Sequence, residues 1–451
     1  MISVIFLTGC VKFQRVSLDP SKSYNEFASR SLESPSLKRF IEEKTGKTNI
    51  DWPSQNWDVP LLSLAGLYYN PSIESARASS KVADSTIITA KARPNPTISA
   101  EGGINSSVLD QSDINPWIPA VNLSIPIETA NKRGYRIAVA SNKVEVQKMN
   151  LMLTSWQVRS NIRASYIELL SAYNRSNIFF KQLQLQEKVR ATQETQLKGG
   201  EIKASDITPM AILIANTQIE LGNISRQLDE AYPRLAAAIG VPLNALKKIN
   251  LQLDLNKDTN AFTFFLSTNL IEFSLKNRPD ILAAIYEYEA AQSTLQLEIA
   301  KQYPNVNLNP GYQWDQGENK WTIGLSVELP IFNKNEGPIA EAMANRNLAA
   351  AKFNELQINI ISEMEAAIVS AQTALEQLNR FSSLYEAKAK HLNDLELQLK
   401  YGIIDALTLE QARLELSATE QPLVEAYINI EKALAGLESA FLLPLEELVK
   451  K

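Results

Sequence analysis

The residue with the most distinctive chemistry is Cys10, the only cysteine in the 451-residue sequence. It follows Leu7, Thr8 and Gly9, after an apolar start at 2–6. A small-residue pair directly before a cysteine resembles the bacterial lipoprotein signal, in which the cysteine becomes the lipidated first residue of the mature chain. No Lys or Arg precedes Cys10 and the apolar run is short, so we expect the true start to lie upstream. The alternative interpretation is a free thiol in a disordered N-terminus.

Side chains that could catalyse a reaction are scarce. With one Cys and one His, the sequence excludes a disulfide framework and a Cys/His zinc site. We find no G-x-S-x-G, H-E-x-x-H or phosphate-loop motif, and therefore predict no enzyme, no cofactor and no metal site. His391 lies within a helical stretch and is interpreted as a surface residue. The net charge of −5, without a clustered basic face, argues against nucleic acid as a partner. The sequence contains no run of 18 apolar residues, so we predict no transmembrane helix.

Two stretches, Tyr135–Lys198 and Ile339–Tyr401, contain neither glycine nor proline and are rich in strong helix formers. As single helices they would each be roughly 95 Å long. Gly199-Gly200 ends the first and Gly402 ends the second, each as a left-handed C-cap. For the returning helices we expect Ser205, Asp206 and Thr208 to offer caps at about 206–239, and Thr408 with Gln411 to form a capping box at 408–442.

The chain is an internal duplication with an offset of about 205 residues. Pro71 pairs with Pro279, Pro126 with Pro330, and the Leu-Lys-x-Gly before Gly200 with that before Gly402. Residues 206–239 and 280–303 together nearly match the long helix in length, which suggests paired helices forming the wall of a tube. In the second half, a coiled-coil seam is predicted at Phe381, Tyr385, Leu392, Leu395 and Leu399, with Lys388 as its one polar position.

Each half also contains two extended runs, at about 96–106 and 118–127 and at about 305–314 and 320–330. Residues 306–314 and 321–329 alternate apolar and polar side chains with period 2, and aromatic residues lie near the ends. This is typical of a transmembrane β-strand, although a half-buried hairpin of a soluble domain alternates identically. Four strands cannot close a barrel, and open edges in lipid leave backbone groups unpaired. If the strands lie in lipid, several copies must share one barrel.

With these features, residues 57–443 resemble the TolC family of outer-membrane efflux proteins, most strongly the cobalt–zinc–cadmium (CzcC-like) branch. The resemblance implies a mainly α fold with a membrane β-hairpin pair per chain, assembled as a homotrimeric α-barrel/β-barrel tunnel from two repeats. It implies a passive duct in outer-membrane lipid that receives substrates from a periplasmic adaptor protein and an inner-membrane RND-type pump. Heavy-metal cations are the first expectation for the substrate; multidrug or type I protein export is the alternative. A structural coiled-coil lipoprotein is the non-channel alternative. The matching segments are Trp57 to Pro71, Pro94 to Pro96, Asn131 to Gly134, Gly200 to Asp206, Leu329 to Ile331 and Gly402 to Leu409.

The resemblance also assigns sites at the far ends of the long helices. The tip turns are expected to dock on the adaptor through Gly200, Glu201, Lys203, Ser205, Asp206, Gly402, Asp405 and Thr408. The acidic rings that close the periplasmic end in the family fall at Thr408 and Gln411, where this chain has no carboxylate. Asp405 and Glu410 lie close and are the alternative aperture residues, with Gln411. An arginine and a tyrosine of the family's gating network are replaced by Ile404 and Leu399, whereas Asp206 matches.

The expected organisation follows from these boundaries. We predict a lipoprotein signal, an irregular lipid-anchored arm, a first repeat, an equatorial linker, a second repeat and a C-terminal tail. In that order the segments are 1–9, 10–60, 61–240 (strands about 96–127, helices about 135–239), 241–272, 273–443 (strands about 305–330, helices about 339–442) and 444–451.

Overall fold

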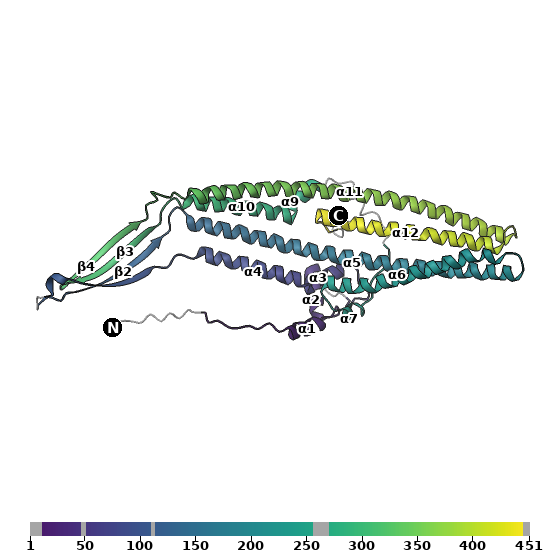
Figure 1. Ribbon diagram of the computed structural model, residues 1–451, viewed down its shortest axis with the longest axis horizontal. Coiled ribbons are helices and arrows are strands. Elements are labelled where there is room, and N and C mark those ends of the chain that lie inside the picture. Colours follow the sequence, from purple (N-terminus) through teal and green to yellow (C-terminus); the bar gives the residue numbers. More distant parts are fainter. Residues whose placement is uncertain (1–10, 47–50, 110–112, 256–269, 445–451) are drawn as a thin grey trace.

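The computed structural model describes residues 11–46, 51–109, 113–255 and 270–444, and shows an elongated molecule with strands at one end and helical turns at the other (Figure 1). The elements are α1 (Pro20–Ala28), α2 (Pro35–Thr45), α3 (Val59–Tyr69), α4 (Pro71–Lys91), β1 (Thr97–Ile104), η1 (Ser106–Val108), β2 (Trp117–Ile127), α5 (Lys132–Lys198), η2 (Ala204–Asp206), α6 (Thr208–Ile239), α7 (Leu243–Leu246), α9 (Leu270–Asn277), α10 (Pro279–Ala300), β3 (Val306–Asp315), β4 (Glu318–Val327), α11 (Glu336–Lys400) and α12 (Ala406–Phe441).

Helices α5 and α11 run the whole length of the helical part, as the glycine-free stretches predict. They contain 67 and 65 residues, so each is roughly 100 Å long. Each begins a few residues earlier than predicted, at an asparagine in the left-handed conformation, Asn131 and Asn335. Asparagine tolerates this conformation better than most residues, which lets the chain turn sharply from strand to helix.

The shorter helices divide the length of α5 between them. Helix α5 packs against α4 and α10 in the half nearer the strands, and against α6 and α12 in the other half. Figure 1 shows α4 and α6 following one side of α5, while α10 and α12 lie on the side facing α11. As predicted, the helices at 206–239 and 280–303 together run back along the long helix, because α6 and α10 both pack against α5. The two helices lie on different sides of α5, which chain length alone could not predict.

The N-terminal arm is more ordered than the irregular segment predicted for 10–60. It contains α1 and α2, and Leu37 and Ile41 of α2 are fully buried together with Trp57. These side chains join α3, the middle of α5 and the end of α6 in one hydrophobic core, called here the equatorial core. Arg30 fastens the arm by donating to the backbone oxygens of Tyr69 and Gly240. Prolines after acceptor side chains start both arm helices, a signal that the sequence contained.

The four strands form one antiparallel sheet in the order β1-β2-β3-β4. The two predicted hairpins are confirmed and pair with each other through β2 and β3. Within this sheet β1 and β4 each have a strand neighbour on one side, so each presents an edge.

Candidate functional site

The sheet separates polar from apolar side chains across all four strands. Directly paired residues share a face, and the register places Ser99 opposite Asn122, Asn122 opposite Gly311, and Gly311 opposite Thr322. The same face carries Ser124, Asn307, Asn309, Gln313, Ser326 and Glu101. The opposite face carries Ile98, Val121, Leu123, Leu308, Tyr312, Trp321, Ile323 and Leu325. The polar faces of the two hairpins therefore lie on the same side of one sheet. The sequence alone predicts two hairpins and could not establish how they are placed relative to each other.

Gly311 has a packing role at the centre of the polar face. A Cβ at this position would lie 2.4 Å from Asn122 Oδ1 and 2.7 Å from Thr322 Oγ1. The side chains from the two neighbouring strands therefore lean over the Gly311 backbone. Any larger residue at 311 must displace them.

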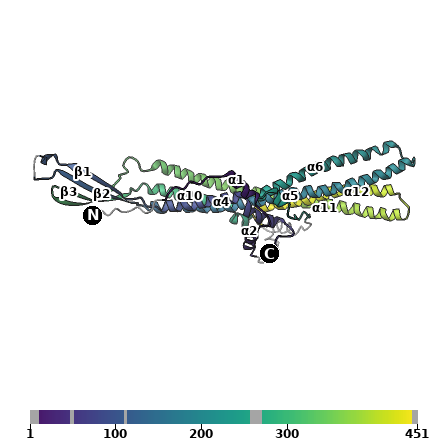
Figure 2. The same cartoon turned by 90° about the horizontal axis from the view of Figure 1, so that it is seen from below.

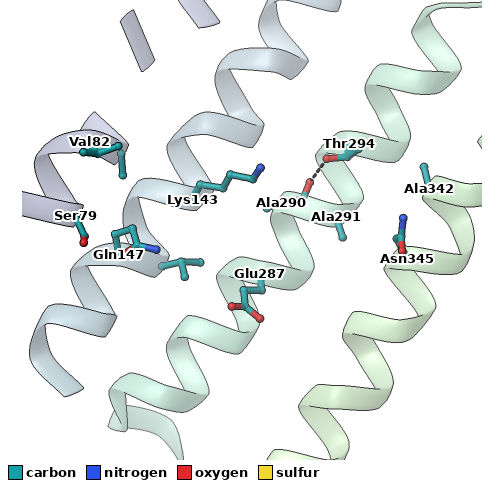
Figure 3. Close-up of a pocket in the computed structure, with 12 residues that line it drawn as sticks. Ser79, Val82, Lys143, Gln147, Glu287, Ala290, Ala291, Thr294, Ala342 and Asn345 are labelled. Carbon is teal, nitrogen blue, oxygen red and sulfur yellow. Dashed lines mark hydrogen bonds between the residues drawn. The ribbon is translucent and has the colours of Figure 1, made fainter. Parts of the chain in front are cut away.

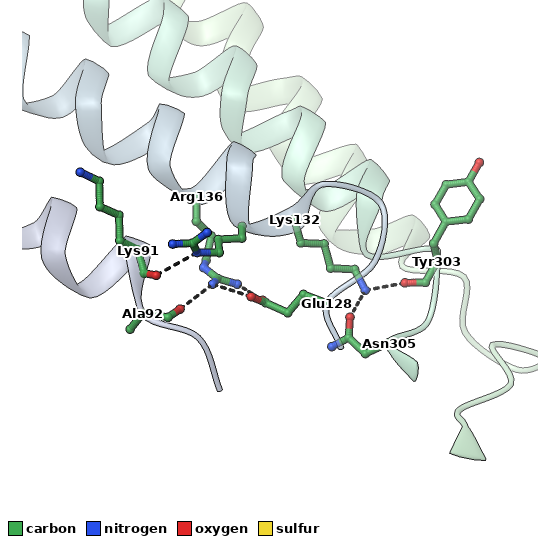
Figure 4. A network of polar contacts seen from close by, with 8 residues as sticks. Lys91, Ala92, Glu128, Lys132, Arg136, Tyr303 and Asn305 are labelled. Atoms are coloured by element: carbon green, nitrogen blue, oxygen red, sulfur yellow. Dashed lines mark hydrogen bonds and ion pairs between the residues drawn. The ribbon is translucent and has the colours of Figure 1, made fainter. Parts of the chain in front are cut away.

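The junction between strands and helices is tied by a polar network (Figure 4). Glu128 forms an ion pair with Arg136, and this contact is the main reason that the pKa of Glu128 lies below its ordinary value. Lys132 is only 8% exposed and donates to Tyr303 O at 2.5 Å and Asn305 Oδ1 at 2.6 Å, in the second repeat. Burial lowers the pKa of Lys132. The predicted turn at Asn131 to Gly134 thus joins the two repeats at the base of the sheet.

Above this junction, a cavity of about 740 Å³ lies in the wall formed by α4, α5, α10 and α11 (Figure 3). Small and aliphatic side chains such as Val82 and Ala290 contribute much of its surface. Lys143 and Glu287 are the charged residues among those that line it. Nothing in this lining selects one class of ligand.

At the opposite end, the two tips contain the same backbone turn. Gly200 and Gly402 have φ of +79° and +70°. In the first tip Glu201 N donates to Gln196 O at 2.9 Å and Gly200 N to Leu197 O at 3.0 Å. In the second tip the equivalent donors are the backbone nitrogens of Ile403 and Gly402, and the acceptors are the carbonyls of Gln398 and Leu399, both at 2.9 Å. This pair of bonds defines the Schellman motif, so the predicted glycine caps are confirmed at both tips.

After the turn, the two tips use their carboxylates differently. Asp206 Oδ2 accepts from Lys203 N at 3.0 Å, and its Oδ1 accepts from Ser205 Oγ at 3.1 Å. Asp405 instead precedes its helix, and its Oδ1 accepts from Thr408 N at 2.8 Å. The predicted Thr408–Gln411 capping box is therefore wrong, because Asp405 is the N-cap of α12 and Thr408 is its donor. The predicted caps of α6 are also wrong: η2 intervenes, and Ile207 precedes α6 without a side-chain cap.

The polarity of the exposed tip surfaces differs as well. Glu201, Lys203 and Ser205 are exposed on the first tip. On the second, Tyr401 is 74% exposed and Ile403 is 69% exposed. Figure 2 shows both tips at the same end of the molecule, where the two hairpins diverge from each other. Their docking role remains a prediction.

Of the predicted aperture residues, Asp405 and Gln411 are exposed and Glu410 is buried. Glu410 Oε1 lies 2.7 Å from Lys188 Nζ of α5 and 3.0 Å from Arg413 Nη1, and Arg413 in turn lies 2.9 Å from Glu396 of α11. Glu410 therefore connects α12 with α5, and Arg413 connects α12 with α11. Lys188, the partner of Glu410, lies 222 residues away in the sequence, so this contact could not be predicted from residue spacing.

The seams of the two helical hairpins also differ. In the second hairpin, Leu395 is buried, Phe381 packs against the core, and Lys388 forms an ion pair with Glu415 at 2.7 Å. In the first hairpin, α5 carries a row of glutamines that was not predicted from the sequence. Each of them has a buried side-chain atom without a hydrogen-bond partner; they are Gln182, Gln186, Gln193 and Gln196. The 4-3-4-3 spacing of these positions with Val189 is the signal that could have revealed a polar coiled-coil seam.

Buried ion pairs join the repeats in the middle of the molecule. Arg163 of α5 lies 2.6 Å from Glu438 and 3.4 Å from Glu431 of α12, and Arg159 lies 3.0 Å from Glu438. Burial raises the pKa of Glu431 despite the nearby Arg163. These contacts hold the C-terminal part of α12 against α5, about halfway along α5.

Two other predictions concern single residues away from these clusters. Cys10, the predicted lipidation site, lies outside the described residues. His391 is exposed on α11, as predicted. Among the described helices, none is both long and apolar enough to cross a bilayer, and no group of three or more His, Cys, Asp or Glu in the described part of the chain could hold a metal ion.

Comparison with known proteins decides the family. The outer membrane efflux protein family matches residues 65–241 and 270–441, which include both repeats. The chain belongs to this family. Its members are efflux proteins of the outer membrane and not enzymes.

Individual relatives are distant but extensive. The cobalt-zinc-cadmium resistance protein CzcC of Cupriavidus metallidurans is 23% identical over 70% of this chain and 74% of its own length. The probable outer membrane lipoprotein SilC of Salmonella typhimurium is 22% identical over 96% of this chain and 97% of its own length. The crystal structure of the outer membrane protein VceC from Vibrio cholerae superposes with a TM-score of 0.68, at 20% identity, covering 86% of this chain and 99% of VceC. The mainly helical fold with its four-stranded sheet is thus that of this family.

Proposed function

We propose that this protein is the outer-membrane channel of a tripartite efflux system and passively conducts heavy-metal cations to the exterior. The observation that carries the channel assignment is the sheet, in which one face is polar and the other apolar over four strands in register. An apolar outer face suits lipid and a polar inner face suits a water-filled lumen. The two sheet edges require neighbours, because unpaired backbone groups in hydrocarbon cost several kcal/mol each.

Three copies sharing one barrel of twelve strands would supply those neighbours. The mass of the full-length protein in detergent tests this assembly, and insertion into a planar bilayer tests the channel. We expect the mass of three chains and a stable ionic conductance. A monomer without conductance would contradict the membrane assignment of both hairpins.

The metal substrate is supported by similarity, because CzcC is named for resistance to cobalt, zinc and cadmium. The proposed lumen is lined largely by neutral amides and hydroxyls such as Asn122, and charged residues occur on the same face at Glu101 and in the Lys320–Asp315 ion pair. Such a wall binds no ion strongly, so selectivity would come from an inner-membrane RND-type pump and a periplasmic adaptor. Growth of cells that lack the protein on a broad panel of toxic compounds would show whether it exports drugs instead of metals.

We also propose that Cys10 is lipidated and anchors the chain in the outer membrane. The relative SilC, matched over nearly the whole chain, is named as a probable lipoprotein. Labelled palmitate should enter the unmodified protein and not the Cys10→Ser variant. Equal labelling of both proteins would contradict the assignment.

A further inference from the structure

The two segments that lead from a strand into a long helix correspond to each other. The first junction, residues 126–134, joins β2 to α5, and the second junction, residues 330–338, joins β4 to α11. Each begins at a proline, and in each the residue before the helix is a left-handed asparagine, Asn131 or Asn335. Both matches have the offset from 126 to 330, so each position of the first junction has a defined counterpart in the second.

The first junction is fastened to the segment that enters β3. Lys132 Nζ donates to Tyr303 O at 2.5 Å and to Asn305 Oδ1 at 2.6 Å (Figure 4). Thr129 Oγ1 donates to Pro304 O at 2.6 Å. Because β2 and β3 are neighbours in the sheet, these contacts tie the end of one strand to the entry of the next.

The second junction follows β4, which lies at the edge of the sheet. By the same offset, Asn333 takes the place of Thr129, and Glu336 takes the place of Lys132. Both Asn333 and Glu336 are exposed. In the part of the chain that the structure describes, the Glu336 carboxylate has neither an ion pair nor a hydrogen bond. The contacts that fasten the first junction therefore have no equivalent within one chain.

Exposed apolar side chains accompany the second junction. Phe332 is 98% exposed and Ile331 is 68% exposed, directly after Leu329 at 70%. The counterpart of Phe332 is Glu128, which pairs with Arg136 of its own helix. Large apolar side chains gathered beside the edge strand β4 indicate a surface that another molecule covers.

The complementary surface lies at the entry of β1. This entry corresponds to the entry of β3 and reads Arg93, Pro94 and Asn95. All three are exposed, and within the described residues Arg93 forms no ion pair. Where Lys132 donates to oxygens, Glu336 must accept. The guanidinium of Arg93 and the amide N–H groups of Asn95 are the donors that a carboxylate requires.

We propose that the second junction docks on the β1 entry of a second copy of this chain, with Glu336 bonded to Arg93 of the partner subunit and to Asn95 of the partner subunit. One chain cannot make this contact with itself, because β1 and β4 lie at opposite edges of its sheet. The inference rests on the proposed sharing of one barrel by several copies. It adds the residues by which one copy recognises the next.

Charge reversal in the full-length protein tests the contact. Glu336→Arg and Arg93→Glu each bring like charges together, so each should lower the yield of assembled protein in detergent about tenfold. The double variant restores opposite charges and should recover the yield to within about twofold of the unmodified protein. Lys334→Glu is the matched control and should assemble normally, because its counterpart Ala130 has no polar side-chain group.

A cysteine pair detects the contact directly. Asn333→Cys combined with Asn95→Cys should give disulfide-linked chains after mild oxidation, and Asn333→Cys alone should not. Absence of linkage in a sample that keeps the mass of the assembly would overturn the inference and leave the shared barrel intact. Normal assembly of both single charge reversals would also overturn it, and would show that Glu336 serves only the first turn of α11. A monomeric unmodified protein would refute the shared barrel itself.

Discussion

The two helical hairpins share one turn and have opposite seams. Both tips close with a Schellman motif at a left-handed glycine, Gly200 or Gly402. Below the turn, α5 buries amide groups without a hydrogen-bond partner, whereas α11 buries Leu378 and Leu395 and packs Phe381 against the core. A buried polar atom without a hydrogen bond costs about 1–3 kcal/mol. The two tips therefore share one geometry, and we expect the first hairpin to open more readily than the second.

The largest expected effect concerns the feature that the hairpins share. A Cβ at Gly200 or Gly402 would meet nothing within 4 Å, so the chain itself leaves this space open for a partner. A side chain there would also strain the left-handed backbone by roughly 1–2 kcal/mol. We predict that Gly200→Asp and Gly402→Asp each abolish metal efflux and cross-linking to the adaptor, with insertion and oligomeric mass intact.

Gly199→Ala is the matched control for these variants, because Gly199 has φ of −77° and accepts a Cβ at ordinary contact distance. It should retain efflux. Loss of the oligomer in the Gly200→Asp or Gly402→Asp variant would show that the glycines only cap helices. Normal efflux in the double variant would remove the docking assignment.

The next prediction exchanges the seams. Gln186 is fully buried with both amide atoms unpaired, so Gln186→Leu should stabilise the first hairpin by about 1–3 kcal/mol. Leu395→Gln should destabilise the second by about 2–4 kcal/mol, because it removes apolar burial and adds an unpaired amide. Hydrogen exchange of backbone amides in each hairpin measures both changes. Gln184→Leu, on an exposed position of α5, should alter protection little. Equal protection of the two unmodified hairpins would contradict the proposed difference.

A smaller difference is expected between two ion pairs with the same 2.7 Å separation. Lys188→Ala removes a partner of the buried Glu410 and should cost about 1–3 kcal/mol. Lys388→Ala breaks a pair with Glu415, whose side chain is 61% exposed, and should cost less than about 1 kcal/mol. We compare the thermal unfolding of each single variant with that of the two double variants in which both members of one ion pair, Lys188–Glu410 or Lys388–Glu415, are replaced. A larger cost for Lys388→Ala would reverse the assignment of which contact is buried.

The smallest effect is expected at the caps. The hydroxyl and backbone N–H of Thr408 lower the pKa of Asp405. The folded-state pKa is below the unfolded value, so the cap contributes fully above about pH 4 and its contribution disappears as the pH falls through the lowered pKa. Asp405→Asn should remove this pH dependence from the fraying of the first turn of α12. NMR of amide shifts between pH 2 and 6 would detect it, and an unchanged titration would exclude Asp405 as its source.

The sequence predicted those features that depend on neighbours along the chain. Gly200 and Gly402 end helices because only glycine enters the left-handed region freely, and the alternation around Asn309 and Ile323 marks strands by period alone. Features that depend on distant partners were missed. The burial of Glu410 needs Lys188 of the other repeat, and the order of the arm needs the equatorial core. The capping role of Asp405 was missed because it depends on the residue at which α12 begins. Helix boundaries are the least reliable part of a prediction from sequence.

We propose that metal cations leave the cell through this protein. This proposal is tested most directly by deleting the gene and measuring growth in zinc, cobalt, cadmium and copper beside a panel of organic drugs. We expect the deletion to cause sensitivity to divalent metals, and we expect a plasmid copy to restore tolerance and a Gly402→Asp copy not to restore it. Sensitivity to drugs alone, with unchanged tolerance of every metal, would contradict it.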